Sequence, residues 1–269
     1  MSTVGPVGAV LRQWRRHRRM SQLDLAEHAE ISTRHLSCVE TGKAKASPEM
    51  LLVLASALEM PLKDRNRLLV AAGYAPPYPD SGPSDELARA LHVILGGLEP
   101  NPAIVIDPAW DLVQANQAAG AMFTYFAPAM IQRIARGERA NLMLALVDDE
   151  GLRSSITNWE DVAAAVIDRL HREAAAHPGP DGPERTLRAL LDRPGLPSRF
   201  VRPELDSDPR AFIEVRLQHA GIPTPLRFFT TIQTMGTAID VAASRLMIET
   251  YFPVDDATRK WLERVGNGL

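Results

Sequence analysis

The sequence is poor in cysteine, because Cys38 is the only one among 269 residues. A single thiol excludes a disulfide within the chain and any zinc site built on cysteine ligands. No apolar run approaches the roughly 18 residues that are needed to cross a bilayer. The first residues, MSTVGPVG, also lack the apolar core of a signal peptide. These absences predict a soluble, cytoplasmic protein without membrane insertion.

The sequence patterns of several large enzyme classes are also missing. The chain has no glycine-rich phosphate loop, no dinucleotide-binding glycine pattern and no nucleophile elbow. His171 and His177 lie six residues apart across a predicted helix end, which is a poor spacing for metal ligands. Because no catalytic set can be assembled, we expect neither an enzymatic activity nor a cofactor.

Positive charge is concentrated at one end of the chain. Residues 1–72 hold 11 lysines and arginines against 7 acidic residues, a net charge of +4, whereas the remaining 197 residues hold 19 against 26, a net charge of −7. Release of counterions from phosphate would draw the first part alone to nucleic acid. The N-terminal quarter is therefore the part expected to bind DNA.

Residues 21–43, SQLDLAEHAEISTRHLSCVETGK, read as two short helices joined by a tight turn. Ser21 and Ser32 are suitable N-caps, and Gly42 is suited to end the second helix. At about 100° per residue, the face of the second helix that points away from its apolar residues is small and polar. That face carries Thr33, Arg34, Ser37 and Cys38. A capped helix of this kind is typical of a helix-turn-helix, whose second helix enters the major groove of double-stranded DNA.

The spacing over residues 22–42, Q-x2-LA-x4-IS-x3-LS-x2-E-x-G, resembles the helix-turn-helix of the lambda-repressor/Cro (XRE) family. This resemblance implies an all-α domain of five helices, a phosphate contact from Gln22 and a structural ion pair between Arg15 and Glu40. Glu30 departs from the family pattern, which has glycine at the turn. Either Glu30 takes a positive φ at a cost of roughly 1 kcal/mol, or the turn has a slightly different geometry.

Arg34 is the best candidate for reading a base. A guanidinium can form a bidentate pair with guanine O6 and N7, which is worth ~1–3 kcal/mol of discrimination; the alternative is a solvated side chain. The smaller residues of this face are expected to contact thymine methyl groups, water or phosphate: Thr33, Ser37 and Cys38. Lys43 and Lys45 follow the helix and are expected to contact phosphate. A thiol near arginines is also reactive, so Cys38 is either a redox sensor or, as we prefer, a small residue that fits.

Caps and periodicity predict three further helices in the N-terminal part, at Val7–Arg19, Ser47–Leu58 and about Leu62–Ala72. The segment that follows, YAPPYPDSGP, holds four prolines and a glycine in ten positions, which predicts a stiff, extended linker. The expected organisation is therefore a DNA-binding domain over 1–73, a linker over 74–83 and a second domain over 84–269.

The second domain mixes helix and strand signals. Helices are expected at Asp85–Leu98, from the cap Asn116 to Phe126, at Asn141–Val147, at Trp159–Glu173 and at about Asp255–Val265. Alternating β-branched and aromatic residues predict strands at Ala103–Asp107, Trp110–Ala115, Phe212–Leu217, Leu226–Thr234 and Leu246–Phe252. This order predicts an α+β domain with one antiparallel sheet and helices on one face.

Several strings of the chain resemble MmyB-like transcription regulators, which carry a PAS-like ligand-binding domain behind an XRE-type helix-turn-helix. They are STRHLSCVETGKAKAS at 32–47, PLKDRNRLLVAAGYAP at 61–76, PNPAIVIDPAWDLVQANQAA at 100–119, NLMLALVDDEGL at 141–152 and LRFFTTIQTMGTAIDVAASRLMIETYFPVDDAT at 226–258. The matches span nearly the whole chain, except residues 177–210. The resemblance implies a DNA-binding regulator whose second domain binds a small apolar molecule such as a fatty acid.

The candidates for an apolar pocket are inward residues of the predicted sheet and of the small helix beside it. They are Ile104, Ile106, Val113, Phe123, Phe126, Met130, Phe228, Thr230 and Ile232. Such residues are more often plain core, and only the resemblance favours a pocket. A fatty acid would also need a hydrogen-bond donor near the mouth of the pocket, for which the candidates are Asn116, Arg133 and Arg153.

The sequence therefore leaves two hypotheses about function, which belong to different classes. One is a ligand-responsive transcriptional regulator that binds DNA as a homodimer, and the other is an enzyme with a DNA-tethering module. The missing catalytic set favours the regulator. A simple antitoxin-like repressor is a third alternative, but a second domain of nearly two hundred residues argues against it.

Overall fold

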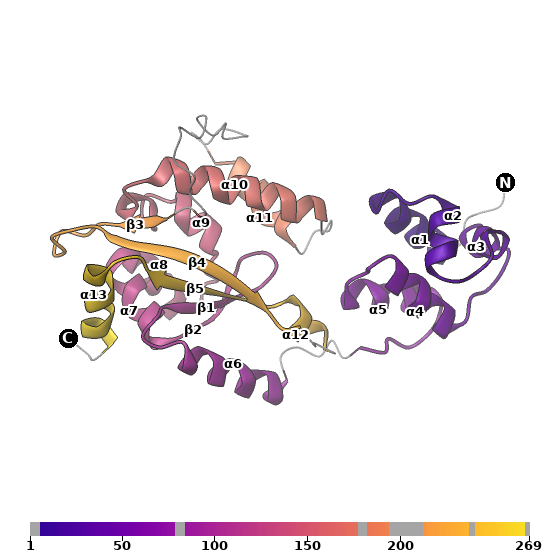
Figure 1. Ribbon diagram of the computed structural model, residues 1–269, viewed down its shortest axis with the longest axis horizontal. Helices are drawn as coiled ribbons and strands as arrows, with labels where there is room; N and C mark the ends of the chain where they lie inside the picture. The colour runs from indigo at the N-terminus through magenta and orange to yellow at the C-terminus, as the bar shows by residue number, and fades with distance from the viewer. Residues whose placement is uncertain are drawn as a thin grey trace. The chain divides into compact units, whose positions relative to one another are not determined.

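The computed structural model describes residues 6–78, 84–176, 182–193, 212, 214–236 and 240–266. The chain divides into two compact units, of which the first consists of 1–83 with 236–244 and the second of 84–235 with 245–269. Figure 1 shows that residues 6–78 are helical, whereas the second unit has a sheet with helices packed on it. The second half of the predicted linker lies outside the described residues.

Five helices form the first unit between residues 6 and 78: α1 (Pro6–His17), α2 (Gln22–His28), α3 (Thr33–Glu40), α4 (Pro48–Ala57) and α5 (Leu62–Ala71). Serine side chains start three of them, as the sequence predicts. Ser21 accepts a hydrogen bond from the backbone N–H of Asp24, and the Asp24 carboxylate accepts one from the N–H of Ser21, which completes a capping box. Ser32 and Ser47 cap α3 and α4 with a single bond each, accepting from the backbone N–H of His35 and of Met50.

The turn between α2 and α3 and the end of α3 use the left-handed backbone region. Glu30 has φ 53°, so of the two alternatives the chain takes the strained positive φ where the family pattern has glycine. Gly42, with φ 75°, follows the C-cap Thr41 and ends α3. Fully buried leucines then fill the space among the five helices: Leu11, Leu25, Leu36, Leu51, Leu54, Leu58 and Leu68.

Helix α1 crosses the C-terminal end of α3 at very short range. A Cβ atom built on Gly8 would lie 2.1 Å from the carbonyl oxygen of Glu40, so only glycine allows this approach. The start of the predicted linker is also fixed to the helices. The buried Asn66 side chain exchanges two hydrogen bonds with the backbone of Tyr78, and the Tyr74 hydroxyl donates to the carbonyl oxygen of Ala46.

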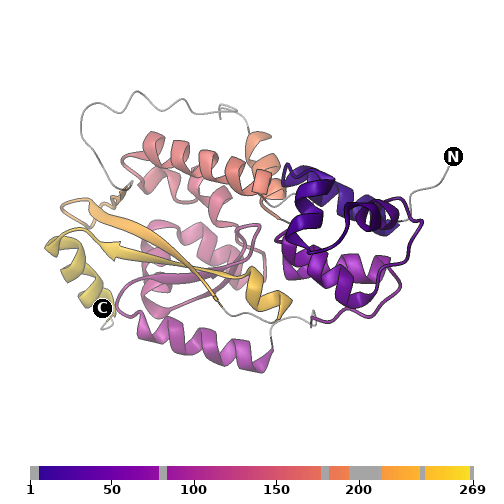
Figure 2. The same ribbon diagram turned by 45° about the vertical axis from the view of Figure 1, so that its right-hand side comes forward.

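The second unit contains one five-stranded antiparallel sheet with the order β2-β1-β5-β4-β3. Its strands are β1 (Ala103–Ile106), β2 (Leu112–Ala115), β3 (Val215–Leu217), β4 (Leu226–Thr234) and β5 (Met247–Pro253). The long strands β4 and β5 run side by side through the middle of this unit in both views (Figures 1 and 2). The predicted strands are thus present, except that Trp110, with φ 64°, lies in the turn before β2 and that β3 begins only at Val215, after Phe212 and Glu214.

Helices cover both faces of the sheet, so the expectation of helices on one face was incomplete. The helices on the main core face are α7 (Gln117–Phe126), α8 (Pro128–Ala135), α9 (Leu142–Val147), α10 (Trp159–Ala176), α11 (Pro183–Leu191) and α13 (Asp256–Gly266). Helix α6 (Asp85–Gly97) packs on β1 from the other side and buries its leucines outside that core. Both views show α6 and α10 on opposite sides of the sheet (Figures 1 and 2). All four residues of β1 are consequently buried.

Four short elements after Phe126 were not predicted individually, and the first of them is α8, which starts at Pro128 directly after α7. Helix α11 begins at Pro183 directly after a Pro/Gly-rich segment, and η1 (Arg153–Ser155) and α12 (Val241–Arg245) have only three and five residues. Elements of that length do not show a hydrophobic period. No helix in the described part of the chain is long and apolar enough to cross a membrane.

Candidate DNA-binding surface and ligand site

The outward face of α3 has the composition that the sequence predicts. Its inner side is buried through Leu36, Val39 and Glu40. Arg34 is exposed, and the residues beside it on the predicted face are half-buried: Thr33, Ser37 and Cys38. This geometry gives one cation with small polar neighbours on a helix of eight residues, a surface that suits a major groove.

The two lysines behind α3 differ in how firmly they are held. Lys43 and Lys45 are both exposed. The ammonium of Lys45 lies 5.3 Å from the centre of the Tyr74 ring, a cation–π distance, while the Tyr74 hydroxyl is itself hydrogen-bonded. Lys45 is therefore partly positioned before any phosphate is bound.

One buried carboxylate joins the first three helices. Glu40 is 0% exposed and accepts hydrogen bonds from Nε and Nη2 of Arg15 at 2.8 and 3.1 Å. It also accepts one from Nε2 of Gln22 at 2.8 Å. The ion pair expected from the repressor-type pattern is thus confirmed. Because an amide nitrogen carries two hydrogens, Gln22 keeps a second N–H that can donate to a phosphate, and that contact stays a prediction.

Most arginines between residues 12 and 19 form hydrogen bonds within the first unit, so its net positive charge overstates the number of cations that are free to contact DNA. The Arg12 guanidinium donates to the carbonyl oxygens of Gly8 and Glu40, and that of Arg18 donates to those of Leu58 and Glu59. With Arg15 on Glu40, three of the five arginines between residues 12 and 19 hold helices together. The two exposed arginines of this stretch are Arg16 and Arg19.

The aromatic residues proposed for an apolar pocket lie in a filled core. Phe123, Phe126 and Phe228 are 1%, 1% and 0% exposed. The Phe126 ring packs 5.8 Å from that of Trp261, between ring centres. Ile104 and Ile106 belong to the same cluster, and Ile232 packs against it half-buried. Val113 is 47% exposed, so the prediction that it faces the core was wrong. The residues of β2 that pack against the core are Leu112 and Ala115.

Met130 and Arg133 line a pocket between α8, α9 and the turn after α9. The pocket has a volume of about 90 Å³ and is lined by Ala129, Met130, Arg133, Arg139, Ala140, Asn141, Leu144, Ala145, Asp148, Glu150, Gly151 and Arg193. An apolar cavity of about 150 Å³ accommodates benzene. The pocket as formed therefore holds a group of a few atoms and not a C12–C18 chain.

The structure does not bring the other predicted polar residues to this pocket. Asn116 caps α7, and its side-chain amide hydrogen-bonds four backbone groups. Its oxygen accepts from the N–H groups of Ala103 and Ala119, and its nitrogen donates to the carbonyl oxygens of Leu95 and Asn101. A ligand role for Asn116 would break these bonds. Arg153 lies 4.2 Å over the ring of Trp159 and pairs with Asp149. Thr230 lies half-buried in β4, on the core face of the sheet.

A buried acidic residue beside Thr230 was missed by the sequence reasoning. Glu249 of β5 is 7% exposed, and the Tyr251 hydroxyl donates to it at 3.3 Å. Burial raises the pKa of the Glu249 carboxyl to about 7, and hydrogen bonds from Thr230 and Tyr251 oppose this rise. The alternation Met247-Ile-Glu-Thr-Tyr251 was the available signal, because it puts Glu249 on the same face as two core residues.

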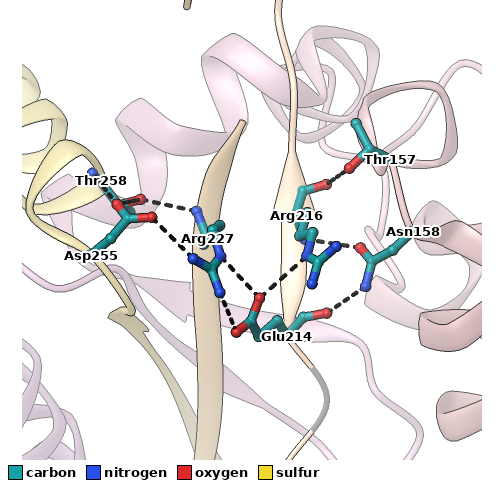
Figure 3. Close-up of polar contacts among 7 residues, drawn as sticks. All are labelled: Thr157, Asn158, Glu214, Arg216, Arg227, Asp255 and Thr258. Carbon is teal, nitrogen blue, oxygen red and sulfur yellow. Dashed lines mark hydrogen bonds and ion pairs between the residues drawn. The ribbon is translucent and has the colours of Figure 1, made fainter. Parts of the chain in front are cut away.

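A second charge cluster, shown in Figure 3, belongs to the scaffold. Glu214 accepts from Nε and Nη2 of Arg227 at 3.0 and 2.7 Å and from Nε of Arg216 at 3.2 Å. These bonds, led by that from Arg227, hold the pKa of the Glu214 carboxyl below its ordinary value. Arg227 also reaches Asp255 and Thr258 at the start of α13, so the cluster joins β3, β4 and this helix.

Comparison with known families agrees with both units. Residues 6–68 match the family model of a helix-turn-helix domain, and residues 87–265 match that of the MmyB-like transcription regulator ligand binding domain. No curated protein matches the chain. The second match covers more than half of the 269 residues. The chain therefore belongs to the MmyB-like transcription regulators, with a helix-turn-helix DNA-binding domain ahead of the ligand-binding domain.

Proposed function

We propose that this regulator reads a specific DNA sequence through the outward face of α3, and that an apolar ligand of its second unit changes its affinity for DNA. The observation that carries the first half is the exposed Arg34 between small polar residues on a capped helix. Glu40, anchored by Arg15 and Gln22, fixes that helix against its two predecessors.

We expect Arg34→Ala to relax specificity at one base position of each half-site. The loss should be ~1–3 kcal/mol on the specific site with little change on random DNA, because a bidentate guanine contact is specific. Lys43→Ala is the matched control: it should weaken both kinds of DNA alike and lower the salt slope by about one charge. Selection from a randomised site library measures the preference, and an unchanged preference in Arg34→Ala would mean that α3 is oriented differently on DNA.

The proposal includes a homodimer on an inverted repeat. One helix-turn-helix contacts only a few base pairs, so two copies with half-site centres about 34–36 Å apart, or a multiple of that, are needed for specificity. The second unit, with its acidic balance, is the part proposed to form the interface, because like charge keeps it off the DNA.

For the ligand, we propose the pocket beside α8 as the point of entry. Arg133 lines it and supplies a cation for an anionic head group, whereas a chain as long as a fatty acid would have to open the neighbouring Phe126 core. Arg136 is a close control, because both arginines are exposed and pair with Glu138, but Arg136 is not among the residues that line the pocket.

We therefore expect Arg133→Ala, but not Arg136→Ala, to reduce the melting shift that short and C12–C18 fatty acids cause. A ligand at about 100 times its Kd should stabilise the wild type by about 2.7 kcal/mol. DNA affinity is measured with and without the same acids. If neither melting nor DNA affinity responds to any chain length, the fatty-acid part of the proposal is wrong.

The enzyme alternative is tested on the same material. Native mass spectrometry of the gently purified protein identifies any bound molecule, and incubation then distinguishes retention from turnover. An unchanged molecule in stoichiometric amount supports the regulator with a bound effector, whereas conversion of that molecule supports the enzyme.

A further inference from the structure

The core face of the sheet carries an acidic group without a cationic partner in the described part of the chain. Glu249 sits in the middle of β5, between Ile104 of β1 and Ile232 of β4, and is 7% exposed. The Tyr251 hydroxyl donates to it at 3.3 Å, which is long for an O–H···O bond, and the side chain of Thr230 is its other hydrogen-bond partner. Burying a carboxylate in this way is costly unless it is paired or holds a proton.

The cation that acts electrostatically on Glu249 is Arg169, which is already paired with a different carboxylate. On α10, Nε of Arg169 donates to Glu173 at 2.6 Å, and its guanidinium lies 4.7 Å over the ring of Trp110. The indole N–H of Trp110 donates to the other oxygen of Glu173 at 2.9 Å. Arg169, Glu173 and Trp110 thus form a closed group that faces Glu249 across the core.

Trp110 itself is held under strain. It has φ 64° and is 1% exposed, although a bulky residue rarely adopts this backbone conformation. Such a residue persists only where its surroundings fix it, and such positions cluster at functional sites. The indole is therefore a sensitive reporter of the positions of Arg169 and Glu173.

We propose that Glu249 is a proton-binding site in the core of the ligand-binding unit, and that its ionisation draws Arg169 from Glu173 and displaces the Trp110 indole. The groups that face Glu249 are Tyr251 on its own strand, Thr230 on β4, and Arg169 and Glu173 on α10. Arg169 favours the ionised form and Glu173 opposes it, while burial, the largest effect, sets the pKa at about 7. The unit would thus change its internal ion pairing as the pH passes through neutrality.

The experiment is a 19F NMR titration of the full chain labelled with 5-fluorotryptophan, between about pH 5.5 and 8.5, the range in which a carboxyl shifted by burial titrates. The resonance of Trp110 is assigned by its loss in Trp110→Phe. In the wild type it should shift with a midpoint near 7, and in Glu249→Gln it should stay constant. The midpoint in Tyr251→Phe should move to higher pH, because a donor to the carboxylate is lost.

The histidine nearest in sequence to Glu173 serves as the control. His171→Gln removes the imidazole on α10 and leaves Glu249 in place, so the midpoint should not move. The proposal is overturned if the Trp110 resonance does not titrate, or if its titration persists in Glu249→Gln or disappears in His171→Gln. Should Glu249→Gln fail to fold, the shift in Tyr251→Phe decides: an unmoved midpoint assigns the proton to another group.

Discussion

Replacement of Glu40 by alanine is expected to lower the melting temperature of the first unit by more than about 10 °C. The carboxylate is fully buried and carries two bonds from Arg15 and one from Gln22. Removing one partner of a buried ion pair leaves the other charge uncompensated and costs ~3–5 kcal/mol. For a unit of this size each kcal/mol corresponds to roughly 4–8 °C. DNA binding of the variant should be lost at its lowered melting temperature, because unfolding of the first unit releases α3 from α1 and α2.

The measurement follows the 19F resonance of Trp14 in the full chain labelled with 5-fluorotryptophan, because Trp14 lies in α1 of the first unit whereas Trp110, Trp159 and Trp261 lie in the second. This separates unfolding of the first unit from that of the second. Glu27→Ala is the control, since Glu27 is exposed on α2 and its loss should change stability by no more than about 0.5 kcal/mol. Equal melting of Glu40→Ala and Glu27→Ala would show that the buried carboxylate does not hold the three helices together.

The second large effect concerns pH and the second unit. The pKa of Glu249 is raised from 4.5 to about 7 in the folded protein, so the folded state binds this proton more tightly than the unfolded chain. The associated stability is fully present below about pH 4.5, declines as the pH rises, and is lost above about pH 7. Between about pH 5 and 8 the wild type should therefore lose about 2–3 kcal/mol that Glu249→Gln does not lose.

Urea unfolding of the second unit at the two pH values measures this difference. Other groups titrate in both proteins, so only the difference between wild type and variant is assigned to Glu249. Glu263→Gln, an exposed carboxyl on α13, is the control and should follow the wild type. Parallel loss of stability in wild type and Glu249→Gln would place the proton elsewhere and contradict the burial argument.

Local interactions of the first unit could be predicted from the sequence. Ser21, Ser32 and Ser47 each bond to a backbone N–H three residues ahead, so cap and helix start lie within one short stretch of sequence. For Glu30 the sequence left two alternatives, a positive φ or a different turn, and the structure has the positive φ. The outward face of α3 needed only the helical period.

Interactions between distant residues could not be predicted in this way. Gln22 lies 18 residues from Glu40, and nothing in its own segment indicates that its amide binds a buried carboxylate. Gly8 looks like a weak position in a helix until Glu40 is placed against it. The ligand residues had the same difficulty: helical spacing predicts Phe123, Phe126 and Met130 on one face of one helix, which is wrong because α7 ends at Phe126 and Met130 lies in α8. Only packing decides whether such residues form core or a pocket.

Residues on the inner side of α3 must be preserved for the fold, whereas residues on its outer side are free to change during evolution. Leu36, Val39 and Glu40 hold the helix, whereas Arg34 and Ser37 make no contribution to the buried core of the first unit. Substitutions on the outer side can therefore accumulate without loss of the fold. A lineage that duplicates this gene could acquire a new operator through a few codons of α3, while its ligand-binding half stays unchanged.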